Sequence, residues 1–204
     1  MSDETQKKLT VGILAYGSLI SDPRAEIENA QVSIIRDVMT PFHIEFARSS
    51  NGRGGAPTLV PVASGSAHVK GQVFVVNVPE NEATDILYRR EIGRVDEMTR
   101  TYKRPDQVTD NSVLVERLTN FAGLDVVLYT QIAATVSPLT AEHLAELAIA
   151  SVAKAPDGRD GISYLMAAKE DGIITALTPT YEAEILKKTQ CESLNEAREK
   201  LLTA

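Results

Sequence analysis

The sequence predicts an α+β fold, because its strand-forming segments come before its helix-forming segments along the chain. The first two thirds of the 204 residues contain short apolar runs bounded by Gly, Pro and Asn, which is typical of strands. The last third has apolar residues at helical spacing between polar capping residues. We see no internal repeat, low-complexity segment or linker, and therefore expect a single domain over residues 1–204.

The first half of the chain is expected to hold several strands and one short helix. The apolar run 11–16 predicts the first strand, and the glycine after it predicts a turn. Asp22 and Pro23 are typical of a helix start and predict a helix to about Asn29. Gly71 lies inside another predicted strand, where it indicates a bulge or a close backbone contact. The further predicted strands are 32–39, 42–47, 58–62 and 68–78, with a flexible loop at 49–55.

The second half is expected to begin with strands and end with helices. A helix is predicted over 82–92, at the end of the first half; Pro79 precedes it and Gly93 ends it. The apolar face of that helix leads to Arg90 and Glu91 in its last turn, so charge falls on the side that should be buried. Later strands are predicted at 99–103, 113–118 and 125–136, with a hairpin at 120–125, and helices at 140–152, 162–169, 179–188 and after Ser193.

Composition and charge exclude several classes of function. The formal net charge is −7, from 28 acidic and 21 basic side chains, which disfavours a nucleic-acid partner. The one cysteine, Cys191, cannot form an intrachain disulfide and suggests a reducing compartment. No apolar stretch approaches the roughly 20 residues that span a bilayer, and residues 2–10 are polar. We therefore expect a cytoplasmic protein with no membrane or nucleic-acid partner.

The sequence gives little sign of a metal, a cofactor or a covalent nucleophile. No Gly-x-Ser-x-Gly pattern surrounds Ser18, and Cys191 has no obvious base near it in sequence. The loop at 51–55 lacks the pattern of a nucleotide-binding loop. The histidines are too scattered for a typical ligand set: His43, His68 and His143. We expect no cofactor and no metal.

The segment Tyr16-Gly17-Ser18-Leu19 is the first candidate binding element. It lies where a predicted strand ends and a helix is about to begin. Glycine allows a ligand to approach the backbone, and free N–H groups in such a turn can bind a carboxylate or an oxyanion. The alternative interpretation is an ordinary turn between a strand and a helix.

Glu91 is the candidate catalytic group. Burial favours the protonated form of a carboxyl group, which suits a residue that takes a proton and returns it at neutral pH. The alternative is a structural ion pair with Arg90 or another arginine. A weaker candidate is Arg53, in a loop that either cradles an anion or is simply a mobile hairpin loop.

Taken together and in this order, these segments resemble the γ-glutamylcyclotransferase-like family. Tyr16-Gly17-Ser18-Leu19 is similar to the family's loop after the first strand, and Arg90-Glu91 is similar to the end of its catalytic helix. The pair, about 70 residues apart, is the most specific part of the resemblance. The other similar segments, within residues 11–170, are 46–61 with Arg53, 69–74 with Gly71, 127–129 with Tyr129, and 161–165 with Tyr164, the last as in the ChaC-type branch.

The resemblance implies a fold, a reaction and a role for each residue. The fold would be a small mixed β-barrel flanked by helices. The reaction would be metal-independent release of 5-oxoproline from a small γ-glutamyl amine or peptide, by a lyase or acyltransferase. Glu91 would be general base and acid. The implied substrate-binding residues are Tyr16, Gly17, Ser18 and Leu19 for the glutamyl group, Tyr129 for a pocket wall, and Arg53 and Tyr164 for the leaving-group side.

Two departures separate the chain from the glutathione-specific ChaC-type branch. The protein has no tryptophan, and Ser21-Asp22-Pro23 stands where that branch has one. Ile86 stands where a tyrosine is expected before Leu87. The sequence thus predicts neither the leaving group nor the oligomeric state. The alternative function is a non-catalytic small-molecule-binding or interaction module on the same fold, while a thiol or metal hydrolase is disfavoured.

Overall fold

The computed structural model describes residues 9–203 and has the α+β order that the sequence predicts. The strands are β1 (Val11–Ala15), β2 (Gln31–Met39), β3 (His43–Ser50), β4 (Ala56–Val62), β5 (Lys70–Val76), β6 (Leu114–Phe121) and β7 (Leu124–Gln131). The helices are α1 (Ser18–Ser21), α2 (Arg24–Ala30), α3 (Glu80–Glu91), α4 (Ala141–Val152), α5 (Gly161–Glu170), α6 (Thr178–Thr189) and α7 (Leu194–Leu202), with a 3-10 turn η1 (Asn51–Arg53). No described helix is long and apolar enough to span a membrane.

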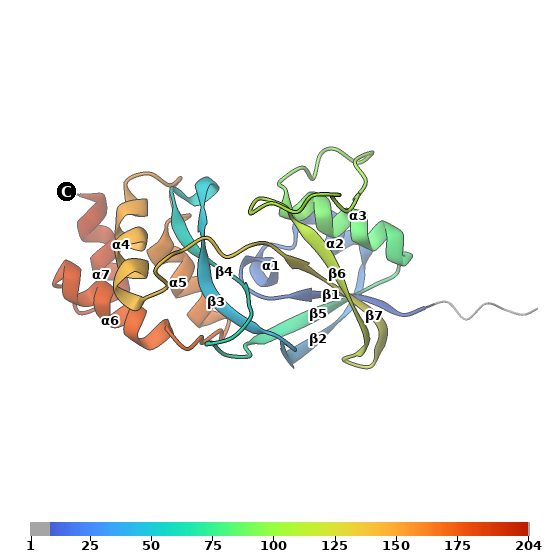
Figure 1. Ribbon diagram of the computed structural model, residues 1–204, viewed down its shortest axis with the longest axis horizontal. Coiled ribbons are helices and arrows are strands. Elements are labelled where there is room, and N and C mark those ends of the chain that lie inside the picture. Colours follow the sequence, from blue (N-terminus) through green and yellow to red (C-terminus); the bar gives the residue numbers. More distant parts are fainter. Residues whose placement is uncertain (1–8, 204) are drawn as a thin grey trace, which may run out of the picture.

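A mixed five-stranded sheet forms one side of the molecule. Its order is β2-β5-β1-β7-β6, with β1 antiparallel to β5 and parallel to β7. The strands β3 and β4 form a separate hairpin, which lies between the sheet and the group of helices α4 to α7 (Figure 1). The sheet ends on β2 and β6, so hydrogen bonds among the described residues do not close the barrel that the resemblance implies.

Both faces of the sheet are covered, which follows from the apolar character of its central strands. On one face, Ile13 and Phe74 pack with Leu87 of α3. On the other face, Leu14 packs with Val73. Neighbouring residues of β1 thus point to opposite sides, as the two-residue repeat of a strand requires. The sheet fixes the C-terminal end of α3 next to the end of β1.

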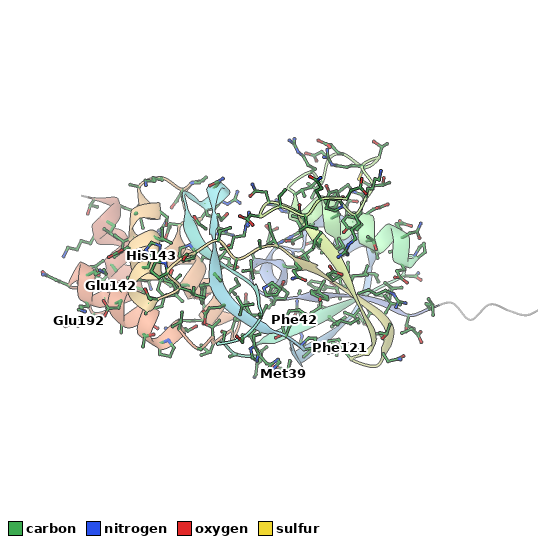
Figure 2. All side chains as sticks on the ribbon, viewed as in Figure 1. Met39, Phe42, Phe121, Glu142, His143 and Glu192 are labelled. Carbon is green, nitrogen blue, oxygen red and sulfur yellow. The ribbon has the colours of Figure 1, made fainter. Side chains whose placement is uncertain are left out.

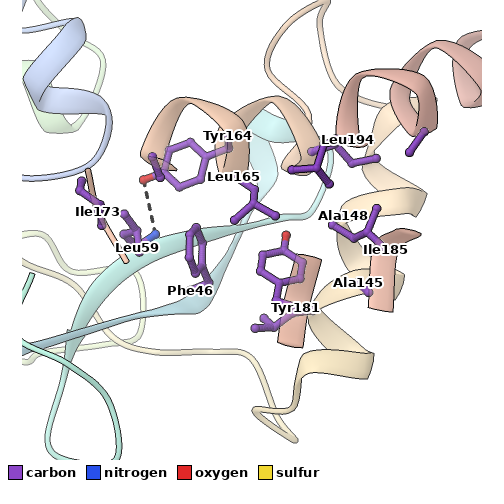
Figure 3. Packing of buried hydrophobic residues seen from close by; sticks show 14 of the residues in the cluster. Phe46, Leu59, Ala145, Ala148, Tyr164, Leu165, Ile173, Tyr181, Ile185 and Leu194 are labelled. Carbon is purple, nitrogen blue, oxygen red and sulfur yellow. Dashed lines mark hydrogen bonds between the residues drawn. The ribbon is translucent and has the colours of Figure 1, made fainter. Parts of the chain in front are cut away.

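The helices α4 to α7 form a second core against the β3–β4 hairpin. Phe46 of β3 lies edge-on to Tyr181 of α6, with ring centroids 5.3 Å apart, and Leu165 of α5 packs in the same cluster (Figure 3). The caps of two of these helices match the sequence prediction: the Thr140 hydroxyl begins α4 and the Ser193 hydroxyl begins α7. The hairpin is therefore held from the helical side.

A buried carboxylate also joins the hairpin to the helices. Glu45 of β3 is 1% exposed, and its oxygens accept hydrogen bonds from the Thr175 hydroxyl at 2.6 Å and the Leu177 N–H at 3.2 Å, just before α6. The Ser66 hydroxyl and the Phe46 N–H supply two more donors. Because a buried charge requires hydrogen bonds on all sides, these donors fix the hairpin in one position.

Two local predictions are wrong. Residues 99–103 form no strand, because the Tyr102 N–H donates to the Asp85 carboxylate of α3 at 2.6 Å instead of to a neighbouring strand. Asp22 does not cap α2, whose N-cap is Pro23, because its carboxylate is paired with Arg24 at 3.0 Å. Asp22 instead closes the short helix α1.

Gly71 is held against the neighbouring strand, as its place in a predicted strand indicates. A Cβ atom at this position would lie 2.5 Å from the carbonyl oxygen of Ala15. We expect Gly71→Ala to lower the free energy of unfolding by about 1–3 kcal/mol, the usual cost of overpacking. The control is Gly52→Ala, since a Cβ there meets nothing within 4 Å. Urea unfolding of both variants tests this; equal midpoints would contradict the close approach.

Candidate active site

The chain leaves β1 through a turn that only glycine fits. Gly17 has φ 60° and ψ −142°, a backbone conformation that is open almost only to glycine. A Cβ atom on Gly17 would lie 2.7 Å from the hydroxyl oxygen of Tyr164. The turn leads into α1, where the N–H groups of Ser18 and Leu19 have no acceptor among residues 9–203. Two backbone donors are therefore free beside this turn.

Tyr16 fixes the start of the same turn to the sheet. Its hydroxyl donates to the carbonyl oxygen of Thr130 at 2.7 Å. Burial raises the pKa of Tyr16 well above its usual value, and the negative charge of Glu91 raises it further. Tyr16 therefore stays a neutral hydrogen-bond donor, in the neighbourhood of the Glu91 carboxylate.

Glu91 is the last residue of α3, and its side chain is 23% exposed. The Arg90 guanidinium lies 2.5 Å from Oε1 of Glu91, so the ion pair considered for this residue is present. Arg90 also donates to the carbonyl oxygen of Asp22 at 2.8 Å and reaches the hydroxyl of Ser18 at 3.4 Å. Arg90 thus connects the end of α3 to α1, while Oε2 of Glu91 accepts no hydrogen bond from the described residues.

Glu91 and the Tyr16–Leu19 turn open onto the same space. A cavity of about 340 Å³, called the cleft below, is lined by Ser18 and Glu91 together with Leu59 of β4 and Ile132 after β7. A smaller space of about 60 Å³ is lined by Tyr16, Leu19, Ser18 and Glu91. Residues about 70 positions apart in the sequence therefore meet at one site.

Tyr164 of α5 forms the wall opposite Glu91's helix. It is 7% exposed, and its hydroxyl accepts a 3.4 Å hydrogen bond from the Leu59 N–H (Figure 3). Burial raises its pKa, an effect that the Leu59 N–H and the Arg53 charge partly oppose. The Arg53 guanidinium lies over the Tyr164 ring, 4.6 Å from its centroid. The structure thus brings Arg53 and Tyr164 together at the cleft.

Tyr129 lines neither the cleft nor the smaller spaces that share residues with it, unlike the other predicted site residues. It stacks on Phe42 with ring centroids 4.5 Å apart, on the sheet face that carries Val127. Because side chains alternate along β7, Tyr129 points to the opposite side from Leu128. Its pKa is raised by burial and by the charge of Glu116. Tyr129 supports Phe42 rather than forming a wall of the cleft.

Arg48 and Arg159 also line the cleft, and no pattern in the sequence predicted either of them. Arg48 follows a shift in the pairing of β3 with β4, between Glu45 and Arg48. Such a bulge re-aims side chains, so strand alternation could not place it. Arg159 lies in the turn before α5, for which a single sequence has no periodic signal.

The described residues contain no group of three or more His, Cys, Asp or Glu side chains that could hold a metal ion. Figure 2 shows His143 on α4 at the helical end and Phe42, the neighbour of His43, beside the sheet. Cys191 is buried and free. The cleft itself is lined by two carboxylates, five arginines and Tyr164.

Asp160 fixes the helix that carries Tyr164. Its carboxylate caps α5 through the Ser163 N–H at 2.9 Å and pairs with Arg198 at 2.8 Å. Burial alone would raise the pKa of Asp160, but Arg198 and Ser163 lower it below the usual value for aspartate. Its stabilising contribution is therefore complete above the unfolded pKa and is lost as the pH falls through the lower folded pKa.

We expect Asp160→Asn to lower the free energy of unfolding at pH 7 by about 2 kcal/mol, the range for hydrogen bonds to charged groups. The difference from the wild type should shrink as the pH falls below about 4. Urea unfolding at pH 7, 5 and 3 measures this. A difference that is constant across these pH values would contradict the lowered pKa.

Comparisons with known proteins give a distant structural likeness. No family model matches the chain, and no curated protein sequence matches it. Among solved structures, a γ-glutamyl cyclotransferase from yeast, described as specific to glutathione, is similar with a TM-score of 0.41. It has 15% sequence identity, and the match covers 96% of this chain and 97% of that one. A likeness this distant carries no information about the reaction.

Proposed function

We propose that this protein is a metal-independent enzyme of the γ-glutamylcyclotransferase type, which converts a small γ-glutamyl amine or peptide to 5-oxoproline and a free amine. The observation that carries the proposal is that Glu91 and Ser18 line both the cleft and the smaller space beside it, where Tyr16 and Leu19 join them, although Glu91 is far from this turn in the sequence. A carboxylate beside free backbone donors is the minimum that this reaction needs. The family, the single domain and the cytoplasmic location remain predictions from the sequence.

The reaction requires one group that both accepts and donates a proton. Glu91 takes a proton from the α-ammonium of the substrate, and the amine then attacks the substrate's own γ-carbonyl carbon. A C–N bond forms, which closes a five-membered lactam, and the bond to the leaving nitrogen breaks. The proton held by Glu91 passes to that nitrogen, so the carboxylate is regenerated. The ring nitrogen loses a second proton as the lactam forms, and the released amine takes up one proton from solvent to become an ammonium ion.

The other groups of the site contribute by holding the substrate in place rather than by transferring protons. Because nucleophile and carbonyl belong to the same molecule, holding them in a near-attack geometry supplies much of the rate. The free N–H groups of Ser18 and Leu19 are suited to the negative charge that develops on the carbonyl oxygen. Tyr16, kept neutral by burial, holds the turn in place through Thr130.

One observation favours the alternative, a module that binds a small molecule without converting it. Arg90 already occupies Oε1 of Glu91, as it would in a purely structural ion pair. Against this, no residue among 9–203 donates to Oε2, and Glu91 still lines the cleft. One carboxylate oxygen of Glu91 is therefore available to a ligand despite the ion pair.

A panel of γ-glutamyl amines and dipeptides, with 5-oxoproline detected by mass spectrometry, tests the proposal. At least one compound should be converted, while the same compound with its α-amine acetylated should be inert because it has no nucleophile. Binding of panel members without any conversion would favour the non-catalytic module. Conversion of the acetylated compound would contradict intramolecular attack.

A further inference from the structure

The cleft is rich in arginine although the whole chain is acidic. Five arginines and two carboxylates line it, whereas the chain as a whole has a net charge of −7. The seven charged residues are Arg24, Arg48, Arg53, Arg90 and Arg159, with Asp22 and Glu91. The cleft therefore carries an excess of positive charge of 5 − 2 = 3 on a negative protein.

The two carboxylates already have partners of their own. Arg24 is paired with Asp22 at 3.0 Å, and Arg90 is paired with Glu91 at 2.5 Å. The other three arginines of the cleft have no carboxylate within ion-pair distance among residues 9–203. The unbalanced charge therefore belongs to Arg48, Arg53 and Arg159.

Neutral groups hold two of these arginines in place. Arg48 donates to the carbonyl oxygens of Asp110 at 2.7 Å and Ala133 at 2.9 Å. Arg53 is stacked on Tyr164 and donates to the carbonyl oxygen of Arg159 at 3.4 Å. Because a guanidinium has five N–H donors, each of them keeps donors to spare. The charges of Asp110 and Asp160 act on Arg48 and Arg53 respectively, but no carboxylate among residues 9–203 forms an ion pair with either arginine.

The environment of Arg53 suits an anionic ligand. Burial lowers its pKa, Tyr164 opposes this, the nearby charges of Arg159 and Arg90 lower the pKa further, and Asp160 has the smallest opposing effect. Partly buried like charges repel one another and would be stabilised by a shared anion. Arginine is also the side chain best suited to carboxylate and phosphate groups, which its planar fork binds through two hydrogen bonds.

The location of the three arginines indicates which part of a substrate they would contact. They come from β3, the hairpin loop and the turn before α5, whereas Glu91 ends α3 and the free N–H groups belong to α1. The glutamyl group is assigned to α1 and Glu91 in the proposed reaction. The arginines therefore face the part of the substrate beyond the bond that is broken.

Resting on the proposed function, we propose that the leaving amine carries an anionic oxygen group, a carboxylate or a phosphate, which Arg48, Arg53 and Arg159 bind together. This names the substrate class as γ-glutamyl conjugates of amino acids, peptides or phosphorylated amines. Conjugates of neutral or cationic amines are excluded, since they would leave the three charges unbalanced.

Two matched substrate pairs test this inference. The first is γ-glutamylglycine against γ-glutamylglycinamide, and the second is γ-glutamyl-O-phosphoethanolamine against γ-glutamylethanolamine. At low salt, kcat/KM for 5-oxoproline release should be at least about tenfold higher for an anionic member, mostly through KM. The pair with the larger ratio distinguishes a carboxylate from a phosphate, and raising the NaCl concentration should reduce the ratio.

Two variants test whether the arginines of the cleft cause the preference for the anionic substrate. Arg53→Met should bring the ratio close to one. Arg117→Met should leave it unchanged, since Arg117 lies in β6 outside the cleft and pairs with Glu80 of α3. A thermal melt of both variants checks that they fold. Calorimetry with the Glu91→Gln variant measures the affinity for both members of each pair. It shows whether the anionic member binds more tightly when no turnover occurs.

The outcomes separate the inference from the reaction. Turnover with equal kcat/KM within both pairs would overturn the anionic leaving group and leave the reaction standing. Absence of turnover together with preferential binding of the anionic members would overturn the reaction and support the arginine site. Absence of both turnover and preference would overturn both.

Discussion

Glu91→Gln is expected to lower kcat for 5-oxoproline release by about 10²- to 10⁴-fold, the usual contribution of a general acid–base group. The amide keeps the size of the side chain but cannot take a proton from the substrate's ammonium or return it to the leaving nitrogen. Because the free N–H groups and the arginines are untouched, KM should change much less than kcat. Steady-state kinetics with the best compound of the panel give both quantities.

The matched control is Glu82→Gln, an exposed residue of the same helix that does not line the cleft. It should leave kcat within about twofold of the wild type, since surface substitutions of this kind have small effects. A thermal melt of Glu91→Gln is also needed, because the variant loses its ion pair with Arg90. A folded Glu91→Gln protein with normal kcat would refute the assigned role of Glu91.

Gly17→Ala is expected to lower kcat/KM by at least about 100-fold, since a misplacement of about 1 Å near the reacting atoms can cost that much. The added Cβ would lie 2.7 Å from the Tyr164 hydroxyl, so the turn or α5 must shift. The positive φ of Gly17 adds strain of about 1–3 kcal/mol for any other residue. Activity and urea unfolding should therefore both change.

A double variant separates the two causes. Gly17→Ala with Tyr164→Phe removes the hydroxyl that the new methyl group meets, while the strain at φ 60° stays. We expect the double variant to be more active than Gly17→Ala alone and still less stable than Tyr164→Phe alone. Additive effects of the two substitutions would show that the contact between Gly17 and Tyr164 does not control the site.

Much of the fold could be predicted from local patterns in the sequence. The apolar run of β1, the valine-rich run of β5 and the capping residues Thr140 and Ser193 each act over a few neighbouring residues. The strand predicted at residues 99–103 does not form because the Tyr102 N–H bonds to Asp85, a partner distant in sequence. The four-residue helix α1 was missed because so short a segment has no periodicity.

The candidate site was predicted in part. The Tyr16–Leu19 turn, Glu91, Arg53 and Tyr164 could be named because a resemblance links them, and each lines the cleft or a smaller space that shares residues with it. Tyr129 was named on the same basis and lies on the other side of its strand, against Phe42. Arg48 and Arg159 could not be found, since a bulge and a turn bring them to the cleft from distant segments.

The reaction run in H₂¹⁸O, with the product identified by mass, tests the central claim most directly. Attack by the substrate's own amine yields 5-oxoproline, whose oxygens all come from the substrate and carry no label. We predict unlabelled 5-oxoproline from the wild type and almost none from Glu91→Gln. Glutamate with one ¹⁸O in its γ-carboxylate would mean that water is the nucleophile, and it would contradict cyclisation as the function of this cleft.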